Sequence, residues 1–198
     1  LMKHPRTPGG FPTPGVRGCF MSHLRIQREI LRDDLRRVLI LEDDANFSKR
    51  FDSRIVAMAQ TLKSRNWGFV YGWHPHRETG ADRSEDIEFA PVDASLGVRM
   101  SHFVGVNGAA SQRLVPYLEA MLRRPLGDPA GGPMHVDGAY SWFRAAHPEF
   151  LTLTPDTPLA LQRPSRSDIH GSKWFDKIEA ARPMITALRR VKGVLRAI

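Results

Sequence analysis

The chain of 198 residues carries a formal net charge of +8, from 29 Lys and Arg against 21 Asp and Glu. Hydrophobic residues make up 41% and charged residues 25%, which is ordinary for a globular chain and excludes general disorder. The length suits one domain with a real core. A single cysteine, Cys19, excludes an internal disulfide and favours a reducing, cytoplasmic location.

The positive charge favours polyanionic partners. Nucleic acid is not expected, because the sequence has neither zinc-finger spacing nor a basic run interleaved with aromatic residues. No apolar run approaches the roughly 18 to 20 residues that span a bilayer. A soluble protein, or one bound peripherally to an anionic membrane, is therefore expected, and a phosphate-bearing substrate would also suit the charge.

The first half of the chain predicts a helix, a strand and a second helix. Residues 1–15 are rich in proline and glycine, and helical periodicity then runs from Gly18 to about Asp33. Val38 to Leu41 are four consecutive aliphatic residues, typical of a parallel strand covered on both faces. Ser48 is a candidate N-cap for a helix that ends near Arg65.

The second half predicts further alternation of strands and helices. Strands are expected over 68–72, 87–92, 98–106, 150–154 and 158–162, with helices over 111–123 and 136–146 and polar loops over 73–86 and 123–133. This order predicts an α/β fold with a mostly parallel central sheet and helices on both faces.

Three adjacent carboxylates, Glu42, Asp43 and Asp44, follow the aliphatic run directly. Ligands of open α/β sheets bind beyond the carboxyl ends of strands. Clustered carboxylates repel one another, and a hard divalent cation such as Mn²⁺ or Mg²⁺ would remove that repulsion and neutralise a diphosphate. The alternative is that the acids cap the next helix or lie in a solvated turn.

Five segments resemble glycosyltransferase family 25, the lipopolysaccharide and collagen-modifying sugar transferases. They occur in family order: GCFMSHL at 18–24, LILEDDANF at 39–47, HFVGVNGAASQRLVPYL at 102–118, HVDGAYSWF at 135–143 and LALQRPSRSDI at 159–169. The resemblance implies a Rossmann-like type A glycosyltransferase fold and metal-assisted sugar transfer from a nucleotide-sugar donor, with inversion.

In that resemblance Glu42 and Asp44 stand at the acidic metal and diphosphate motif, and Asp44 is also expected to be needed for catalysis. Asp43 is the close alternative and a candidate donor contact. Ser22 and His23 match the Ser-His of the first motif and are candidate donor-binding residues. A core histidine bonded to a helix backbone remains an equal alternative for His23, and packing is the expected role of Cys19.

Asp137 matches the family's later Asp and is the candidate general base, with helix capping as the alternative. Gln162, Ser167 and Asp168 match the last segment and are expected to line the donor site or fix its loops. His170 is a further candidate ligand.

The N-terminus departs from the family pattern. Family members usually open with a strand and an Arg-bearing loop upstream of the Gly-Cys motif, whereas seventeen residues precede Gly18 here. We expect a sheet without that N-terminal strand, either because the segment lies outside this sequence or because the protein has lost it. In the second case, donor binding would be in doubt.

Residues 171–198 form a separate basic segment after a catalytic domain over 1–170. The segment contains seven Lys and Arg and two acidic residues, and its apolar residues recur near helical spacing. A break in the helix is expected near Arg182. Such a segment is typical of a helix on an anionic membrane surface, and equally of a helix packed on the domain.

The sequence therefore predicts an inverting glycosyltransferase that builds a cell-surface glycan from a nucleotide sugar. Its location would be cytoplasmic, peripheral at the inner face of the membrane. One alternative is a non-catalytic relative that kept the fold as a binding module. The other is a metal-dependent hydrolase of phosphate esters that uses the same acids.

Overall fold

A computed structural model describes residues 10–73, 87–99 and 101–163. The predicted site residues Ser167, Asp168 and His170, the basic segment 171–198 and most of the loop at 73–86 lie outside the described residues. Within the described ranges, every helix is too short or too polar to cross a membrane.

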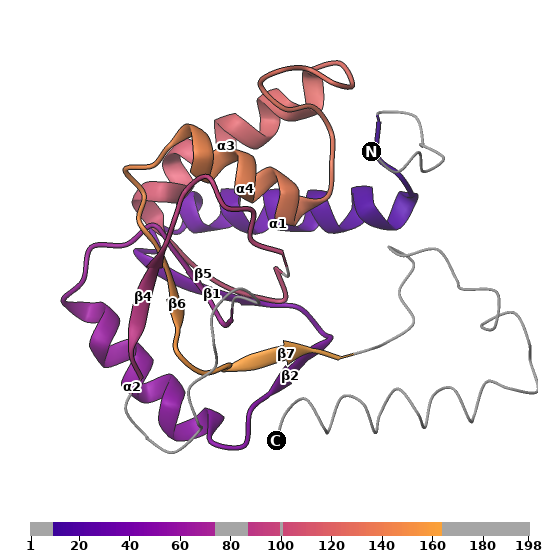
Figure 1. Ribbon diagram of the computed structural model, residues 1–198. Coiled ribbons are helices and arrows are strands. Elements are labelled where there is room, and N and C mark those ends of the chain that lie inside the picture. The colour runs from indigo at the N-terminus through magenta and orange to yellow at the C-terminus, as the bar shows by residue number, and fades with distance from the viewer. Residues whose placement is uncertain (1–9, 74–86, 100, 164–198) are drawn as a thin grey trace, which may run out of the picture.

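Four helices and seven strands are interspersed along the described chain (Figure 1). The helices are α1 (Pro14–Arg32), α2 (Phe51–Lys63), α3 (Gly108–Arg123) and α4 (Val136–Ala146). The strands are β1 (Arg37–Leu41), β2 (Ala45–Phe47), β3 (Phe69–Tyr71), β4 (Phe89–Val92), β5 (Phe103–Asn107), β6 (Thr152–Pro155) and β7 (Ala160–Gln162). The predicted α/β class is confirmed.

Helix α1 begins four residues before the predicted start at Gly18. Thr13 is its N-cap, with its hydroxyl accepting a hydrogen bond from the Val16 N–H at 3.2 Å, and Pro14 occupies the first turn. A Thr-Pro pair of this kind starts a helix because the cap satisfies a free N–H and proline has its φ already set. The Pro-rich composition of the approach hid this signal.

Two other predicted helix starts are wrong. Ser48 does not cap α2, because the helix begins only at Phe51. The backbone N–H of Ser48 instead donates to Leu159 O at 2.9 Å. Helix α3 begins at Gly108, three residues before Ser111, with Asn107 Oδ1 accepting from the Ala109 N–H at 2.9 Å. Helix α4 has the predicted bounds.

The central sheet has five strands in the order β1-β5-β3-β6-β4. Its mostly parallel character was predicted wrongly, because β1–β5, β3–β5 and β4–β6 pair antiparallel and only β3–β6 is parallel. Strands β1 and β3 are both antiparallel to β5, so β1, β3 and β6 run in one direction. The carboxyl end of β1 therefore still lies at the edge of the sheet where the other two end.

The wrong prediction of parallel strand direction is explained by the residues of β1. An aliphatic run indicates burial but not the direction of the neighbouring strand. Strand β1 lies at one edge of the sheet, and only Ile40 is fully buried, while Leu41 is 43% exposed. The short pair β2–β7, with Ala45 opposite Gln162, was missed in part because three residues give no periodicity.

Helices cover both faces of the sheet, as predicted (Figure 1). One core lies between the sheet and α1, α3 and α4, and it includes Phe20, Leu24, Phe69, Val104, Val106, Leu114, Leu118 and Phe143. The second core lies on the opposite face under α2 and includes Met58, Leu62, Val70, Phe103 and Leu153. The two cores hold α1, β1 and α4 in fixed relative positions.

Alanine substitutions at two helical glycines test this packing, because one should lower the free energy of unfolding and the other should raise it. A Cβ at Gly108 would lie 2.6 Å from the backbone oxygen of Leu35, whereas one at Gly18 meets nothing within 4 Å. Gly108→Ala should lower the free energy of unfolding by about 1–3 kcal/mol through overpacking. Gly18→Ala, in the exposed part of α1, should raise it by about 0.5–1 kcal/mol. Urea denaturation of both variants measures the difference, and equal stabilisation by both would contradict the packing described at Leu35.

Candidate active site

The acidic motif lies where β1 leaves the sheet. The Glu42 N–H donates to His102 O at 3.0 Å, which extends the β1–β5 pairing by one residue. Glu42 and Asp44 are half-buried and Asp43 is exposed. Because β5 runs against β1, the residues that precede β5 come alongside the first acid.

The carboxylate of Glu42 is held by side chains from two other segments. Ser101 Oγ donates to Glu42 Oε1 at 2.6 Å, and His23 Nε2 lies 3.1 Å from the same oxygen. The Cys19 thiol is a weaker partner, with 3.9 Å between Sγ and Oε1. Helix α1, the end of β1 and the start of β5 therefore meet at one carboxylate oxygen.

A buried polar chain fixes the histidine from its other side. His23 is 3% exposed, and its Nδ1 lies 3.0 Å from Tyr140 Oη on α4. Gln27 Nε2 donates to the same hydroxyl at 3.0 Å, and Ser111 Oγ donates to Gln27 Oε1 at 2.7 Å. These partners of His23 are side chains, so the predicted alternative of a histidine bonded to a helix backbone does not describe its contacts.

The surroundings shift the pKa of Glu42 downward. Burial raises the pKa, but the hydrogen bonds from His23 and Ser101, with the positive potential of His23 and His102, outweigh it and hold the pKa below its ordinary value of 4.5. Glu42 is therefore a carboxylate at neutral pH.

The same acids shift the pKa of Cys19 in the opposite direction. Burial raises the pKa of the thiol to about 12, and the negative charges of Glu42, Asp137 and Asp44 add to the effect. The thiol is thus protonated, as a packing cysteine would be. Glu42 is the acid beside the sulfur atom, and the charges of Asp44 and Asp137, from two distant segments of the sequence, also contribute to the shift.

Asp44 is fixed by the β2–β7 pair. Gln162 Nε2 donates to Asp44 Oδ2 at 2.8 Å, and the Arg163 N–H donates to Asp44 O at 2.7 Å. Asp44 Oδ1 is buried and has no hydrogen-bond partner among the described residues. Gln162 therefore orients Asp44, and its predicted role in lining the donor site or fixing its loops stays a prediction.

Asp137 occupies the first turn of α4. It is half-buried, and its Oδ1 accepts from the neighbouring Gly138 N–H at 2.8 Å. The first turn also stabilises a negative charge through the helix dipole. The predicted alternative of helix capping thus has some support, and the role of base stays a prediction.

Ser22 and Asp43 lie at the margin of this region. Ser22 is exposed on α1 and, as the neighbour of the buried His23, lies about 100° around the helix from it. The exposed Asp43 is joined to the β7 end through its backbone oxygen, which accepts from Arg163 Nη2 at 3.0 Å. Their donor-binding roles stay predictions.

Sequence reasoning missed Ser101, Tyr140 and Gln27, which hold the acidic residue and its histidine. Tyr140 lies one helical turn after Asp137 inside HVDGAY, so the segment had been found but the residue had not. Ser101 immediately precedes the motif that begins at His102. Only the antiparallel direction of β5 brings Ser101 beside Glu42.

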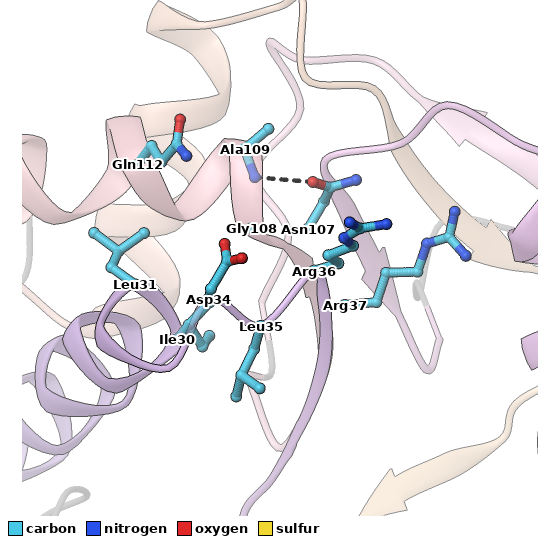
Figure 2. A pocket seen from close by; sticks show the side chains of 10 residues that line it. All are labelled: Ile30, Leu31, Asp34, Leu35, Arg36, Arg37, Asn107, Gly108, Ala109 and Gln112. Carbon is cyan, nitrogen blue, oxygen red and sulfur yellow. Dashed lines mark hydrogen bonds between the residues drawn. The ribbon is translucent and has the colours of Figure 1, made fainter.

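A hollow lies at the opposite end of β1 from the acids (Figure 2). It is lined by Ile30, Leu31, Asp34, Leu35, Arg36, Arg37, Asn107, Gly108, Ala109 and Gln112. None of the predicted site residues that the structure describes lines it. The side chain of Asn107 already accepts from the first turn of α3 there, as the dashed line shows. We therefore place the candidate site at the acids.

Residues 9–89 match the family model for glycosyltransferase family 25 (LPS biosynthesis protein). The chain is 32% identical over 76 residues to the human inactive glycosyltransferase 25 family member 3, which is 35% of this chain and 13% of that protein. It is 28% identical over 61 residues to mouse procollagen galactosyltransferase 2, and 36% identical over 61 residues to zebrafish (Danio rerio) procollagen galactosyltransferase 1. Each of these two alignments covers 30% of this chain and 10% of the relative.

The match therefore covers a part of each protein. It includes the segments GCFMSHL and LILEDDANF and ends at Phe89, before Asp137 and Gln162. The aligned part spans roughly a tenth of the length of the curated relatives. The roles of the residues beyond 89 depend on the resemblance of the later segments and on their positions beside the acids.

The lowered pKa of Glu42 gives a pH dependence with a definite sign. Since the folded pKa is depressed, its stabilising contribution is complete above the ordinary value of 4.5 and is lost as pH falls toward the folded pKa. Ser101→Ala removes a hydrogen bond to a charged group and should cost about 1.5–3 kcal/mol at pH 7. The difference from the wild type should shrink below pH 4.5. Urea denaturation from pH 7 to pH 3.5 measures it, and a deficit independent of pH would exclude this bond as the cause.

Proposed function

We propose that this chain takes part in the transfer of a sugar from a nucleotide-sugar donor to a cell-surface glycan or lipopolysaccharide-type acceptor. The reason is that the chain belongs to glycosyltransferase family 25 over residues 9–89. We further propose that the transfer inverts the anomeric configuration. Two of the relatives are named procollagen galactosyltransferases. Their names do not identify the donor or the acceptor of this chain.

One observation carries the proposal: the acidic motif follows β1, where Ser101 and His23 fix Glu42 and Gln162 fixes Asp44. Asp137 opens α4, and all three acids raise the pKa of the Cys19 thiol. An inverting transfer needs negative charge in two roles, to hold a cation against the leaving diphosphate and to take a proton from the acceptor hydroxyl. Acids that come from two distant segments, the end of β1 and the first turn of α4, suit this division.

Glu42 and Asp44 are the residues that would hold Mn²⁺ or Mg²⁺. Oδ1 of Asp44 is buried and has no partner within the described ranges, and it is suited to such a cation because an unsatisfied buried carboxylate oxygen costs free energy that a ligand bond would recover. When bound, the cation would supply charge neutralisation for the diphosphate. Gln162 would keep Asp44 oriented from the other oxygen.

Glu42 and Asp137 would have different roles, one as a fixed carboxylate and the other as a proton acceptor. His23 and Ser101 hold Glu42 ionised and in place. Asp137 would accept the acceptor proton, for which it must reach the sugar hydroxyl from the first turn of α4. The exposed Ser22 and Asp43 would contact parts of the donor that lie nearer to solvent.

A second candidate is a non-catalytic relative that uses the same fold for binding. Two observations favour it: Glu42 Oε1 already accepts from Ser101 and lies within hydrogen-bond distance of His23, and one of the relatives is named inactive. In that case the network would serve stability alone. Nucleotide sugars would then bind weakly or without dependence on a cation.

The site of action is also a proposal. The basic composition and the segment 171–198 favour a cytoplasmic protein bound peripherally at the inner face of the membrane, near a lipid-linked acceptor. The same segment packed on the domain would give a protein without membrane affinity.

Thermal denaturation with a panel of nucleotide sugars tests the donor and cation roles together. A donor at 100 times its Kd stabilises the native state by about 2.7 kcal/mol, so the donor that binds should raise the Tm only when Mn²⁺ or Mg²⁺ is present. Asp44→Asn should abolish this increase and the transfer of sugar, while the Tm without ligands stays near that of the wild type or rises, because carboxylate repulsion is relieved.

Asp52→Asn is a matched control, since Asp52 lies in the first turn of α2, away from the acidic motif. It should leave the ligand-induced increase intact. Full transfer by Asp44→Asn would refute the proposed role of Asp44. Turnover of a nucleotide diphosphate without an acceptor would instead favour the phosphoester hydrolase.

Asp137→Asn separates the general base from a helix cap. The amide keeps the size and most hydrogen bonds but accepts no proton at neutral pH, so the rate of transfer should fall about a hundredfold or more while donor affinity stays near normal. Steady-state kinetics and donor titration measure both. A joint loss of rate and donor affinity would move Asp137 to the donor site, and an active but less stable variant would make it a cap.

A further inference from the structure

Three ligand-type side chains converge beside the acidic motif, and only one of them belongs to it. Cys19 Sγ, His23 Nε2 and a Glu42 carboxylate oxygen all lie within 4.8 Å of one another. Cys19 and His23 are four residues apart in α1, so they lie on the same face of the helix one turn apart. Glu42 approaches that face from the end of β1.

The separations suit a tetrahedral ion. With Zn–N and Zn–O bonds near 2.0–2.1 Å and a Zn–S bond near 2.3 Å, tetrahedral angles place N and O about 3.4 Å apart and S and O about 3.6 Å apart. In the structure His23 Nε2 lies 3.1 Å from Glu42 Oε1, and Cys19 Sγ lies 3.9 Å from that oxygen. Shifts of a few tenths of an ångström would therefore suffice for these two pairs, and Cys19 Sγ lies within 4.8 Å of His23 Nε2.

The polar chain behind His23 matches what a ligating histidine needs. Such a histidine usually donates its other ring N–H to a fixed partner, which sets the tautomer. Tyr140 Oη lies 3.0 Å from Nδ1, and a hydroxyl can donate or accept by rotating. Accepting from Nδ1–H would leave the Nε2 lone pair free, while the hydrogen bond from Gln27 keeps the tyrosine in place.

We propose that Cys19, His23 and Glu42 form a site for a thiophilic or borderline divalent cation, with Zn²⁺ the best candidate. A thiolate, an imidazole and a carboxylate are the ligands Zn²⁺ takes, whereas Mg²⁺ and Ca²⁺ take oxygen alone. Three protein ligands leave the fourth position open. On binding, the S–H bond breaks, the metal–sulfur bond forms and the thiol proton goes to solvent, while the proton of His23 moves from Nε2 to Nδ1 so that the Nε2 lone pair can bind the metal.

The electrostatics and access of the site support a cation. The thiolate and Glu42 would supply two negative charges, with Asp44 and Asp137 close enough to act on the same sulfur. His23 is buried, but the side chain of Glu42 is 21% exposed, which gives an ion a route from solvent. Ser101 can keep its hydrogen bond to the carboxylate as an outer partner. The site shares Glu42 with the cation proposed for the diphosphate, but it needs no nucleotide sugar, so binding of Zn²⁺ can be measured apart from the transfer activity.

The single cysteine makes the test unambiguous. The full chain, stripped of metal with a chelator and dialysed, is titrated with Co²⁺, and thiolate-to-cobalt charge-transfer absorption is recorded. Because Cys19 is the only cysteine among the 198 residues, this absorption can come from no other side chain. We expect one equivalent of Co²⁺ to produce the band with tetrahedral visible absorption, and Zn²⁺ to displace it.

Variants then assign the other two ligands. Cys19→Ser should abolish the band, and His23→Gln and Glu42→Gln should each weaken Zn²⁺ binding about tenfold or more, with a smaller loss for Tyr140→Phe. His147→Gln, which removes a histidine at the end of α4, is the matched control and should change nothing. Circular dichroism checks folding.

Two results would overturn the proposal. One is a wild-type chain that develops no thiolate band with Co²⁺. The other is a band that persists at unchanged affinity in either His23→Gln or Glu42→Gln, because the thiol would then bind metal without the proposed cluster. Neither result bears on the donor-dependent increase in Tm, so failure here and failure of the proposed transferase activity are distinguishable.

Discussion

The hydrogen bonds on the Glu42 carboxylate are the constraint on which the rest of the site depends. Ser101 and His23 reach one oxygen from the start of β5 and from α1, and Tyr140 supports the histidine from α4. A half-buried carboxylate without such partners would be costly, and with them it stays ionised. The network at Glu42 thereby ties together three elements, of which the first and the last contribute residues 117 positions apart in the chain, His23 and Tyr140.

The network also explains why neighbouring acids have different properties. Glu42 is saturated at one oxygen by protein groups, whereas Asp44 keeps one buried oxygen unpartnered among the described residues and uses the other for Gln162. Of the two, Asp44 has more capacity left for a cation. Cys19 lies among these charges as a protonated thiol, because burial and three carboxylates all oppose its ionisation.

Two kinds of cation would therefore bind through different sets of ligand atoms near Glu42. Oxygen atoms of Glu42 and Asp44 suit a hard ion that accompanies a diphosphate. Sulfur and nitrogen from one face of α1 suit a softer ion at Glu42. The shared carboxylate links the two proposals chemically, and the single cysteine allows them to be separated in an experiment.

The sequence by itself determined the α/β class, the strand at 37–41, the bounds of α4 and the place of the acids after a strand, because each depends on local periodicity and residue order. It also identified most of the segments that meet at the site. Only the tertiary structure decided strand direction, the edge position of β1 and the hydrogen bonds to Glu42 from Ser101 and His23. An aliphatic run records burial but not its neighbours, so the partners of a carboxylate depend on contacts between segments that local patterns do not encode.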